Sequence, residues 1–255
     1  MSGHSKWSTI KHQKGAADVK RGTLFTKLSR DIVLAVRQGG SGDPDTNFRL
    51  RLTIDKARTS NMPQDNIIRA IKRGSGEGGD GAESLEELFY EGYGPGGGAI
   101  LLHAVTSNRN RSAAEVRSTF SRGGGNLGDS GCVAWNFENM GVITLEIADE
   151  EKGEELTLLA IDAGAEDVTL EDGMLEVHTT PDKLLEVQTA LEDVGAVQVT
   201  SEISMVPKST VVLGADEAER TLKLLDSLED LDDIQKAYTN ADFPADVLER
   251  YQANS

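Results

Sequence analysis

The chain has 255 residues and a net charge of −17, with 26 lysines and arginines against 43 aspartates and glutamates. Its single cysteine excludes an internal disulfide framework and a multi-cysteine zinc site. No apolar run approaches the ~18 residues of a membrane-spanning helix, so we expect a soluble protein of the reducing cytoplasm with no membrane partner.

The charge changes sign along the chain. Residues 1–75 hold fifteen lysines and arginines against six acidic residues, whereas residues 76–255 hold eleven basic and 37 acidic residues. A basic segment attached to an acidic body is typical of a protein that binds a polyanion with one end only. We expect the acidic body to favour solubility and to keep polyanions away from other faces, with docking of another protein as the alternative.

The first 80 residues are predicted to form a basic arm followed by a helical bundle. The three helices are predicted over 23–37, near 46–59 and from Pro63 onward. Apolar side chains recur at helical spacing on one side of the first helix, and Ile67, Ile68 and Ile71 are predicted to point inward on the third. The second helix has apolar residues on two faces, so we expect it to be packed on both sides. Lysines and arginines lie on the outer faces, which predicts a cationic surface.

A glycine-rich acidic linker over 74–84 precedes a region of mixed strand and helix periodicity. The predicted order is strands 87–93 and 99–106, helix 112–121, a glycine-rich turn 123–131, strand 141–147, helix 153–162, strands 167–170 and 174–178, helix 181–194, strand 197–203, strand 210–213, helix 216–228 and strand 234–239. The elements between 141 and 203 have the βαββαβ order of a ferredoxin-like domain. The segments on either side are each too short to bury a sheet face, so we expect them to complete one domain around this insertion.

The sequence therefore predicts an α+β fold of three domains. They are a basic arm and helical bundle over 1–80, a discontinuous α/β domain over 81–131 and 208–255, and an inserted ferredoxin-like domain over 132–207. The oligomeric state is left open.

Motifs for nucleotide or metal binding fail in their context. The glycines of residues 92–97 have the spacing of a dinucleotide fingerprint, but an apolar strand follows them where a helix amino terminus is needed. Residues 43–47 begin like a calcium loop that lacks its glycine and its closing glutamate. The four histidines have no ligand spacing. We therefore expect no metal, no cofactor, no small-molecule substrate and no enzymatic activity.

Two groups of basic residues are candidates for binding nucleic acid. In the arm and bundle, a tryptophan could stack on unpaired bases beside lysines that contact phosphates. An island between residues 107 and 127 holds four arginines and one glutamate, and its glycine amides could also meet phosphate. The alternative for the island is that it packs and caps one helix. The candidate residues are Lys6, Trp7, Lys11, His12, Lys14, Lys20, Arg21, Lys27, Arg30, Arg49, Arg51, Lys56, Arg58, Arg69, Lys72 and Arg73 in the first group, and Asn108, Arg109, Arg111, Arg117 and Arg122 in the second.

Ordered blocks along nearly the whole chain resemble the signatures of the YebC/PmpR family. They include GHSKW at 3–7, FTKL at 25–28, NMP at 61–63, YEGYGPGG at 90–97, NRNR at 108–111 and GGNLG at 124–128. This family of probable transcriptional regulators also includes a mitochondrial translational activator. The resemblance implies a helical bundle, an α/β domain and a ferredoxin-like domain inserted in the second.

The resemblance implies two functions. Members are described as DNA-binding regulators and as ribosome-associated factors that relieve stalling at proline-rich stretches. A helix–turn–helix around residues 61–63 could present Gln64, Asn66 and Arg69 to base edges of promoter DNA. The breadth of the basic surface instead suits backbone and shape recognition, as on rRNA or tRNA. The sequence thus predicts a non-enzymatic nucleic-acid-binding regulator, a DNA-binding transcriptional regulator, with a ribosome-associated translation factor as the alternative.

Overall fold

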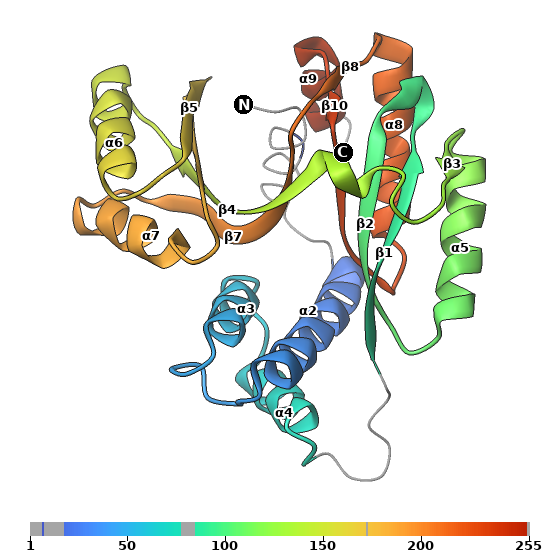
Figure 1. Cartoon of the computed structure of the whole chain (residues 1–255), viewed down its shortest axis with the longest axis horizontal. Coiled ribbons are helices and arrows are strands. Elements are labelled where there is room, and N and C mark those ends of the chain that lie inside the picture. The colour runs from blue at the N-terminus through green and yellow to red at the C-terminus, as the bar shows by residue number, and fades with distance from the viewer. Residues whose placement is uncertain (1–6, 8–17, 78–84, 172, 254–255) are drawn as a thin grey trace. The chain divides into compact units, whose positions relative to one another are not determined.

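The computed structural model describes residue 7 and residues 18–77, 85–171 and 173–253. The chain forms two compact units. One contains Trp135–Thr210, and the other lies within Ile10–Ala134 and Val211–Ser255. Helices and antiparallel sheets both contribute, which confirms the predicted α+β class with helices near the amino terminus (Figure 1).

Three helices form a small bundle in the second of these units. They are α2 (Asp18–Gly39), α3 (Phe48–Thr59) and α4 (Gln64–Gly74). The apolar stripe of α2 packs against both α3 and α4 (Figure 1), and the core includes Leu28, Leu50 and Ile67. The prediction that Ile68 points into the core is wrong, since this side chain is 41% exposed. The next position along a helix is rotated by about 100°, so burial of Ile67 turns its neighbour outward.

The turn between α3 and α4 closes the carboxyl end of α3. The Ser60 and Met62 N–H groups donate to the carbonyls of Lys56 and Ala57, and Asn61 takes a positive φ of 58°. Asparagine tolerates this left-handed conformation better than most residues. Pro63 lies just before α4, one position earlier than predicted.

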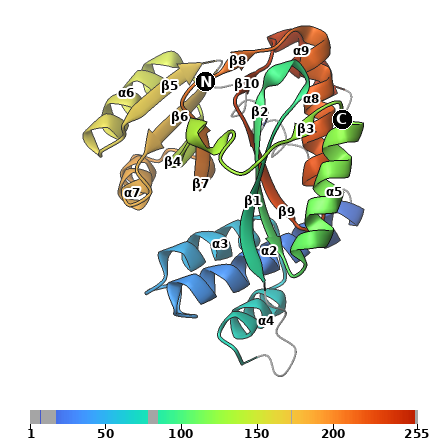
Figure 2. The same cartoon turned by 45° about the vertical axis from the view of Figure 1, so that its right-hand side comes forward.

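A four-stranded antiparallel sheet forms the centre of the same unit. Its order is β3 (Asn126–Leu127), β1 (Glu86–Tyr93), β2 (Ala99–Thr106) and β9 (Ile234–Thr239). In β2 every residue except His103 is buried, as expected of a central strand. Helices α5 (Arg109–Arg122) and α8 (Ala215–Glu229) lie on the same side of this sheet (Figure 2). Strand β9 therefore joins the carboxy-terminal segment to strands that precede residue 135.

The carboxy-terminal segment adds a second, smaller sheet. Strand β8 (Val211–Val212) pairs in parallel with β10 (Ala241–Asp242), and helix α9 (Ala245–Ala253) follows and packs on α8. Neither β10 nor α9 is predicted from the sequence. Two paired residues are too short to show alternation, and the nine residues of α9 form a short helix.

The buried carboxylate of Glu91 fixes the segment that leaves this unit. Its oxygens accept hydrogen bonds from the N–H groups of Gly131, Val133 and Ala134, at 2.6, 2.7 and 2.7 Å. Burial opposes ionisation of Glu91, yet these three donors lower its pKa. The Glu91 carboxylate thus accepts the backbone N–H groups of this loop, which have no partner strand among the described residues to donate to.

The other unit has the predicted βαββαβ order. Its elements are β4 (Phe137–Glu146), α6 (Glu150–Asp162), β5 (Asp167–Glu171), β6 (Met174–Thr179), α7 (Leu184–Asp193) and β7 (Gln198–Pro207). The sheet order is β5-β6-β4-β7 with every neighbouring pair antiparallel, and α6 and α7 lie on one side of it (Figure 1). This confirms the predicted ferredoxin-like topology.

Candidate nucleic-acid interface

Helix α4 has an apolar inner face and a cationic outer face. Ile67 and Ala70 are buried in the bundle core, whereas Arg69, Lys72 and Arg73 are exposed. The side chains of Lys72 and Arg73 form no hydrogen bond or ion pair with any other residue in the described ranges. Three cations within five positions therefore face solvent on a helix that the bundle holds in place.

Arg69 is already in contact with its own helix. Its Nε donates to the carbonyl oxygen of Asp65 at 3.2 Å, and its Nη2 donates to Oδ1 of Asn66. Two of the three side chains predicted to reach base edges thus contact each other, while Gln64 is exposed. Reading a base would require this contact to break.

The cations of α3 differ in how they are used. Lys56 and Arg58 are exposed, and Arg58 forms an ion pair of 3.4 Å with Asp55. Arg51 is half-buried and donates to the carbonyls of Pro44 and Asp45, each at 3.1 Å. Arg51 therefore anchors the loop before α3, whereas Lys56 and Arg58 extend the cationic surface of α4.

Arg49 links α3 to the central sheet. Its Nη2 lies 2.9 Å from Oε1 of Glu87, which also lies 2.7 Å from Nε2 of His103. The hydrogen bond with His103, opposed by burial and supported by Gln38 and Arg49, lowers the pKa of Glu87 to about 2. Arg49 is therefore held by a carboxylate that stays ionised over most of the pH range.

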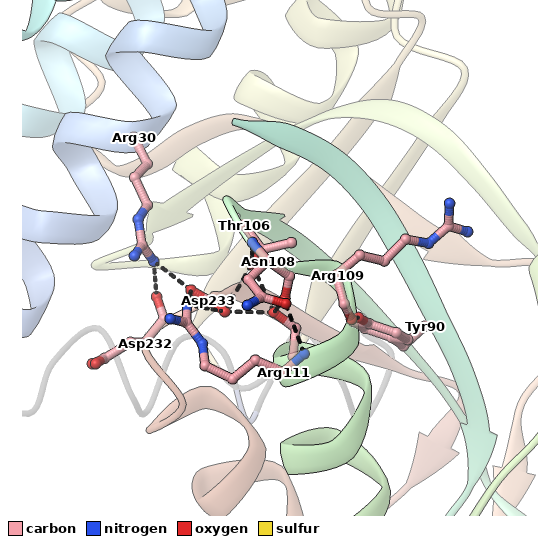
Figure 3. A network of polar contacts seen from close by, with 9 residues as sticks. Arg30, Tyr90, Thr106, Asn108, Arg109, Arg111, Asp232 and Asp233 are labelled. Atoms are coloured by element: carbon pink, nitrogen blue, oxygen red, sulfur yellow. Dashed lines mark hydrogen bonds and ion pairs between the residues drawn. The ribbon is translucent and has the colours of Figure 1, made fainter. Parts of the chain in front are cut away.

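A buried carboxylate, Asp233, holds two of the candidate arginines (Figure 3). Asp233 is 2% exposed, and its oxygens lie 3.1 Å from Nη1 of Arg30 and 2.9 Å from Nη2 of Arg111. The hydroxyls of Thr106 and Ser112 also donate to it. Burial opposes ionisation, but the hydrogen bonds from Ser112, Arg111 and Thr106 lower the pKa of Asp233. Arg30 and Arg111 thus neutralise a buried charge of the fold.

Part of the basic island serves the fold around helix α5. The Asn108 side chain accepts a hydrogen bond from the Arg111 N–H at 3.1 Å and caps the helix (Figure 3). The alternative weighed for the island therefore describes these two residues. Arg109 and Arg117 are exposed, and neither guanidinium forms an ion pair within the described ranges.

The expectation that the glycine amides of the island meet phosphate is wrong for Gly123, Gly125 and Gly128. The N–H groups of Gly123 and Gly125 donate to the carbonyls of Thr119 and Phe120, and the Gly128 N–H donates to Glu91. The Gly123 and Gly125 donors are used because the end of α5 must satisfy its last carbonyls, whereas the Gly128 donor pairs with strand β1.

The other candidates divide into placed and unplaced residues. Lys6, Lys11, His12 and Lys14 lie outside the described residues, and for Lys20 and Arg21 only the backbone in α2 is described. Trp7 is 1% exposed, which corrects the expectation that its ring is offered to bases. Lys27 donates to the carbonyl of Glu229, and Arg122 donates to the Thr119 hydroxyl at 3.3 Å.

Sequence reasoning missed the acidic partners of these arginines. Asp233 lies 122 positions from Arg111, and Glu87 lies 38 positions from Arg49. No local pattern connects such pairs, because the fold alone brings them together. Within the described part of the chain, no helix has the length and apolarity to cross a bilayer, and no three His, Cys, Asp or Glu side chains gather as a metal site would require.

The fold and this surface define a multidomain α+β protein with a basic helical amino-terminal region. Family models match residues 5–77 as the TACO1/YebC protein N-terminal domain and residues 85–241 as the TACO1/YebC second and third domain. The chain belongs to the TACO1/YebC family, which confirms the resemblance seen in the sequence.

Relatives of similar length carry a regulatory name. A probable transcriptional regulatory protein of Moorella thermoacetica is 54% identical over 252 residues, covering 98% of this chain and 99% of the relative. One from Chloroflexus aurantiacus is 52% identical over 254 residues, covering 99% and 100%. The crystal structure of a conserved hypothetical protein from Aquifex aeolicus has 44% identity and a TM-score of 0.81, covering 92% of this chain and 96% of that one.

Proposed function

We propose that this chain is a non-enzymatic regulatory protein that binds DNA through the outer faces of α3 and α4. The observation that carries the proposal is the exposed row of Arg69, Lys72 and Arg73 on a helix whose opposite face is buried. Lys56 and Arg58 extend this surface onto α3. The regulatory name shared by relatives of at least half-identical sequence supports the same reading.

The contacts favour recognition of the sugar–phosphate backbone. Phosphate contacts need exposed cations, whereas base readout needs side chains that are available to form specific hydrogen bonds. Lys72 and Arg73 meet the first requirement, and the contact between Asn66 and Arg69 weakens the second. We therefore expect salt-sensitive binding with modest discrimination between sequences.

The test compares two triple variants of the full chain. Arg69→Glu with Lys72→Glu and Arg73→Glu should weaken binding to a promoter fragment by at least about tenfold, measured by fluorescence anisotropy. The control changes Lys152, Lys183 and Lys208 to Glu, three cations exposed by 39%, 47% and 54% in the ferredoxin-like unit. Equal losses in both variants would show that net charge alone governs binding.

The preference for backbone contacts also favours the alternative, a ribosome-associated translation factor that binds rRNA or tRNA. The same α4 variant separates the two functions. If DNA is the target, a promoter fragment should bind more tightly than a scrambled duplex at equal salt. Co-sedimentation with ribosomes at physiological salt, lost in the α4 variant and kept in the control, would favour the alternative.

A further inference from the structure

An open groove of about 490 Å³ lies between α5 and α8, in the part of the sequence that is acidic overall. The two helices pack against each other on one side of the central sheet (Figure 2). The groove is lined by Thr119, Arg122, Gly123, Arg220, Lys223, Leu224 and Ser227. None of these described lining residues is acidic, and three are cations.

The floor of the groove is buried and closely packed. Thr119 and Leu224 are 3% and 1% exposed. A Cβ added to Gly123 would lie 2.6 Å from Cδ1 of Leu224, so α5 can approach α8 this closely only because that position is glycine. The helices that carry the cations are therefore packed closely against each other at the base of the groove.

The cations retain donors beyond those that their described contacts use. Arg122 uses one donor on the Thr119 hydroxyl, at 3.3 Å. Arg220 uses its Nε on the carbonyl of Asp216, at 3.4 Å. A guanidinium has five N–H donors, so both arginines can make further hydrogen bonds. Lys223 is 76% exposed and lies 3.9 Å from Glu219, at the limit of an ion pair.

We propose that this groove binds the phosphate of a phosphorylated ligand. Arginines match the geometry of phosphate oxygens, and a lysine adds a compact charge beside them. Leu224 is the one large apolar residue of the described lining. The volume lies in the range of about 300–1,000 Å³ of small-ligand sites. The phosphate can belong to a free nucleotide or polyphosphate, or to a nucleic-acid backbone.

The proposal does not depend on the α4 surface. Calorimetric titration of the full chain with inorganic tripolyphosphate should give a Kd that rises at least about tenfold in Arg220→Glu with Lys223→Glu. The control, Lys152→Glu with Lys183→Glu, changes the net charge equally and should shift the Kd by less than about twofold. The α4 triple variant should also bind tripolyphosphate normally, so failure of the proposed DNA binding remains distinguishable.

Four outcomes decide the matter. Equal losses in the groove variant and the control, or no binding by the unaltered chain, would overturn the proposal. If a short DNA duplex also loses affinity in the groove variant, the ligand is a nucleic-acid backbone. If only tripolyphosphate does, it is a free phosphorylated molecule. Thermal melting checks folding, and the single change Lys223→Gln, at a side chain 76% exposed, gives a milder loss without risk to the core.

Discussion

Asp233 is the residue at which three parts of one compact unit meet. Arg30 comes from α2, Arg111 from α5, and Thr106 from the end of β2 (Figure 3). A buried carboxylate is tolerated only when its hydrogen-bonding capacity is filled, and here four side chains fill it. Arg30 and Arg111, which the sequence suggests as nucleic-acid-binding residues, therefore have a structural role as partners of Asp233.

Replacing Asp233 by alanine should destabilise the protein by about 3 kcal/mol, because the change leaves Arg30 largely buried without a counter-ion. Urea denaturation at neutral pH measures the loss. Asp232→Ala is the control, since Arg30 contacts only the main-chain carbonyl of Asp232, and it should cost less than about 0.5 kcal/mol. Similar midpoints for the two variants would show that the contacts around Asp233 contribute little.

Glu87 and Asp31 interact, yet their pKa values move in opposite directions. Pairing with His103 lowers the pKa of Glu87 from 4.5 to about 2, so its ionised form stabilises the fold above pH 4.5 and this contribution is lost between pH 4.5 and 2. Burial raises the pKa of Asp31 above 3.8, although Lys56 and other cations oppose it. Ionised Asp31 therefore costs stability at neutral pH, and the cost disappears as the pH falls through its raised value.

Glu87→Gln should therefore lower the urea midpoint at neutral pH, and Asp31→Asn should raise it. Both differences should shrink in acid, that of Asp31→Asn first, because its carboxyl is protonated at a higher pH. Midpoints measured from neutral pH down through the acid range check this. A stability loss in Asp31→Asn at neutral pH would mean that its attraction to Lys56 outweighs its burial.

The sequence locates the cations but not their roles. Arg69, Lys72 and Arg73 follow the predicted outer face of α4, because helical periodicity alone decides exposure there. Arg30 and Arg49 satisfy the same rule on their helices, yet they contact carboxylates on β-structure or loops distant in the chain. Trp7 is the opposite case, since a lone aromatic among lysines gives no indication that it is buried. Periodicity predicts which side of a helix faces away from the bundle core. Tertiary contacts decide whether a side chain on that side meets solvent or a partner from another part of the chain.

At the level of elements, α3 depends on one buried cap. The Asn47 side chain accepts from the Leu50 N–H at 3.0 Å and donates to the carbonyls of Ala35 and Ser41, each at 2.9 Å. Asn47 is 4% exposed, so these bonds form away from water. One side chain thus joins the end of α2, the connecting loop and the start of α3, and it sets the position of the helix that leads to α4.

Asn47→Ala should cost about 2–3 kcal/mol, because it removes a cap and leaves buried carbonyls unsatisfied. Asn108→Ala removes an exposed cap of the same kind from α5 and should cost about 1 kcal/mol. Chemical denaturation of both variants checks the difference. Equal costs would mean that the bonds to Ala35 and Ser41 add nothing to capping.

Elements with long, regular patterns could be predicted, and short ones could not. Strands β2 and β9 have the bounds that alternation and apolar runs predict, and the βαββαβ order follows from six clear segments. Strands β3 and β10, two residues each, exist only because a neighbouring strand pairs with them. The division into three domains stays a prediction, because the helical bundle and the central sheet share one compact unit through Arg30 and Arg49.

For the whole molecule, the sign of the charge decides which surface a polyanion can approach. The acidic residues of 76–255 outnumber the basic ones by more than three to one, so most of that surface repels phosphate. The exposed cations of α3 and α4 lie outside this range. Under the proposed function, attraction and repulsion together would orient an approaching duplex toward α4, and both would weaken as salt screens them.

If DNA binds at α4, the salt dependence of binding reports the number of phosphates that the protein neutralises. Each phosphate neutralised on duplex DNA contributes about −0.9 to the slope of log K against log salt. Changing Arg69, Lys72 and Arg73 to glutamine should therefore make the slope shallower by about 2–3, as measured by anisotropy over a salt series. Glutamines at Lys152, Lys183 and Lys208 should leave the slope unchanged, because these lysines lie in the acidic part of the chain. A weaker affinity with an unaltered slope would mean that the α4 cations act through the fold and do not contact phosphate.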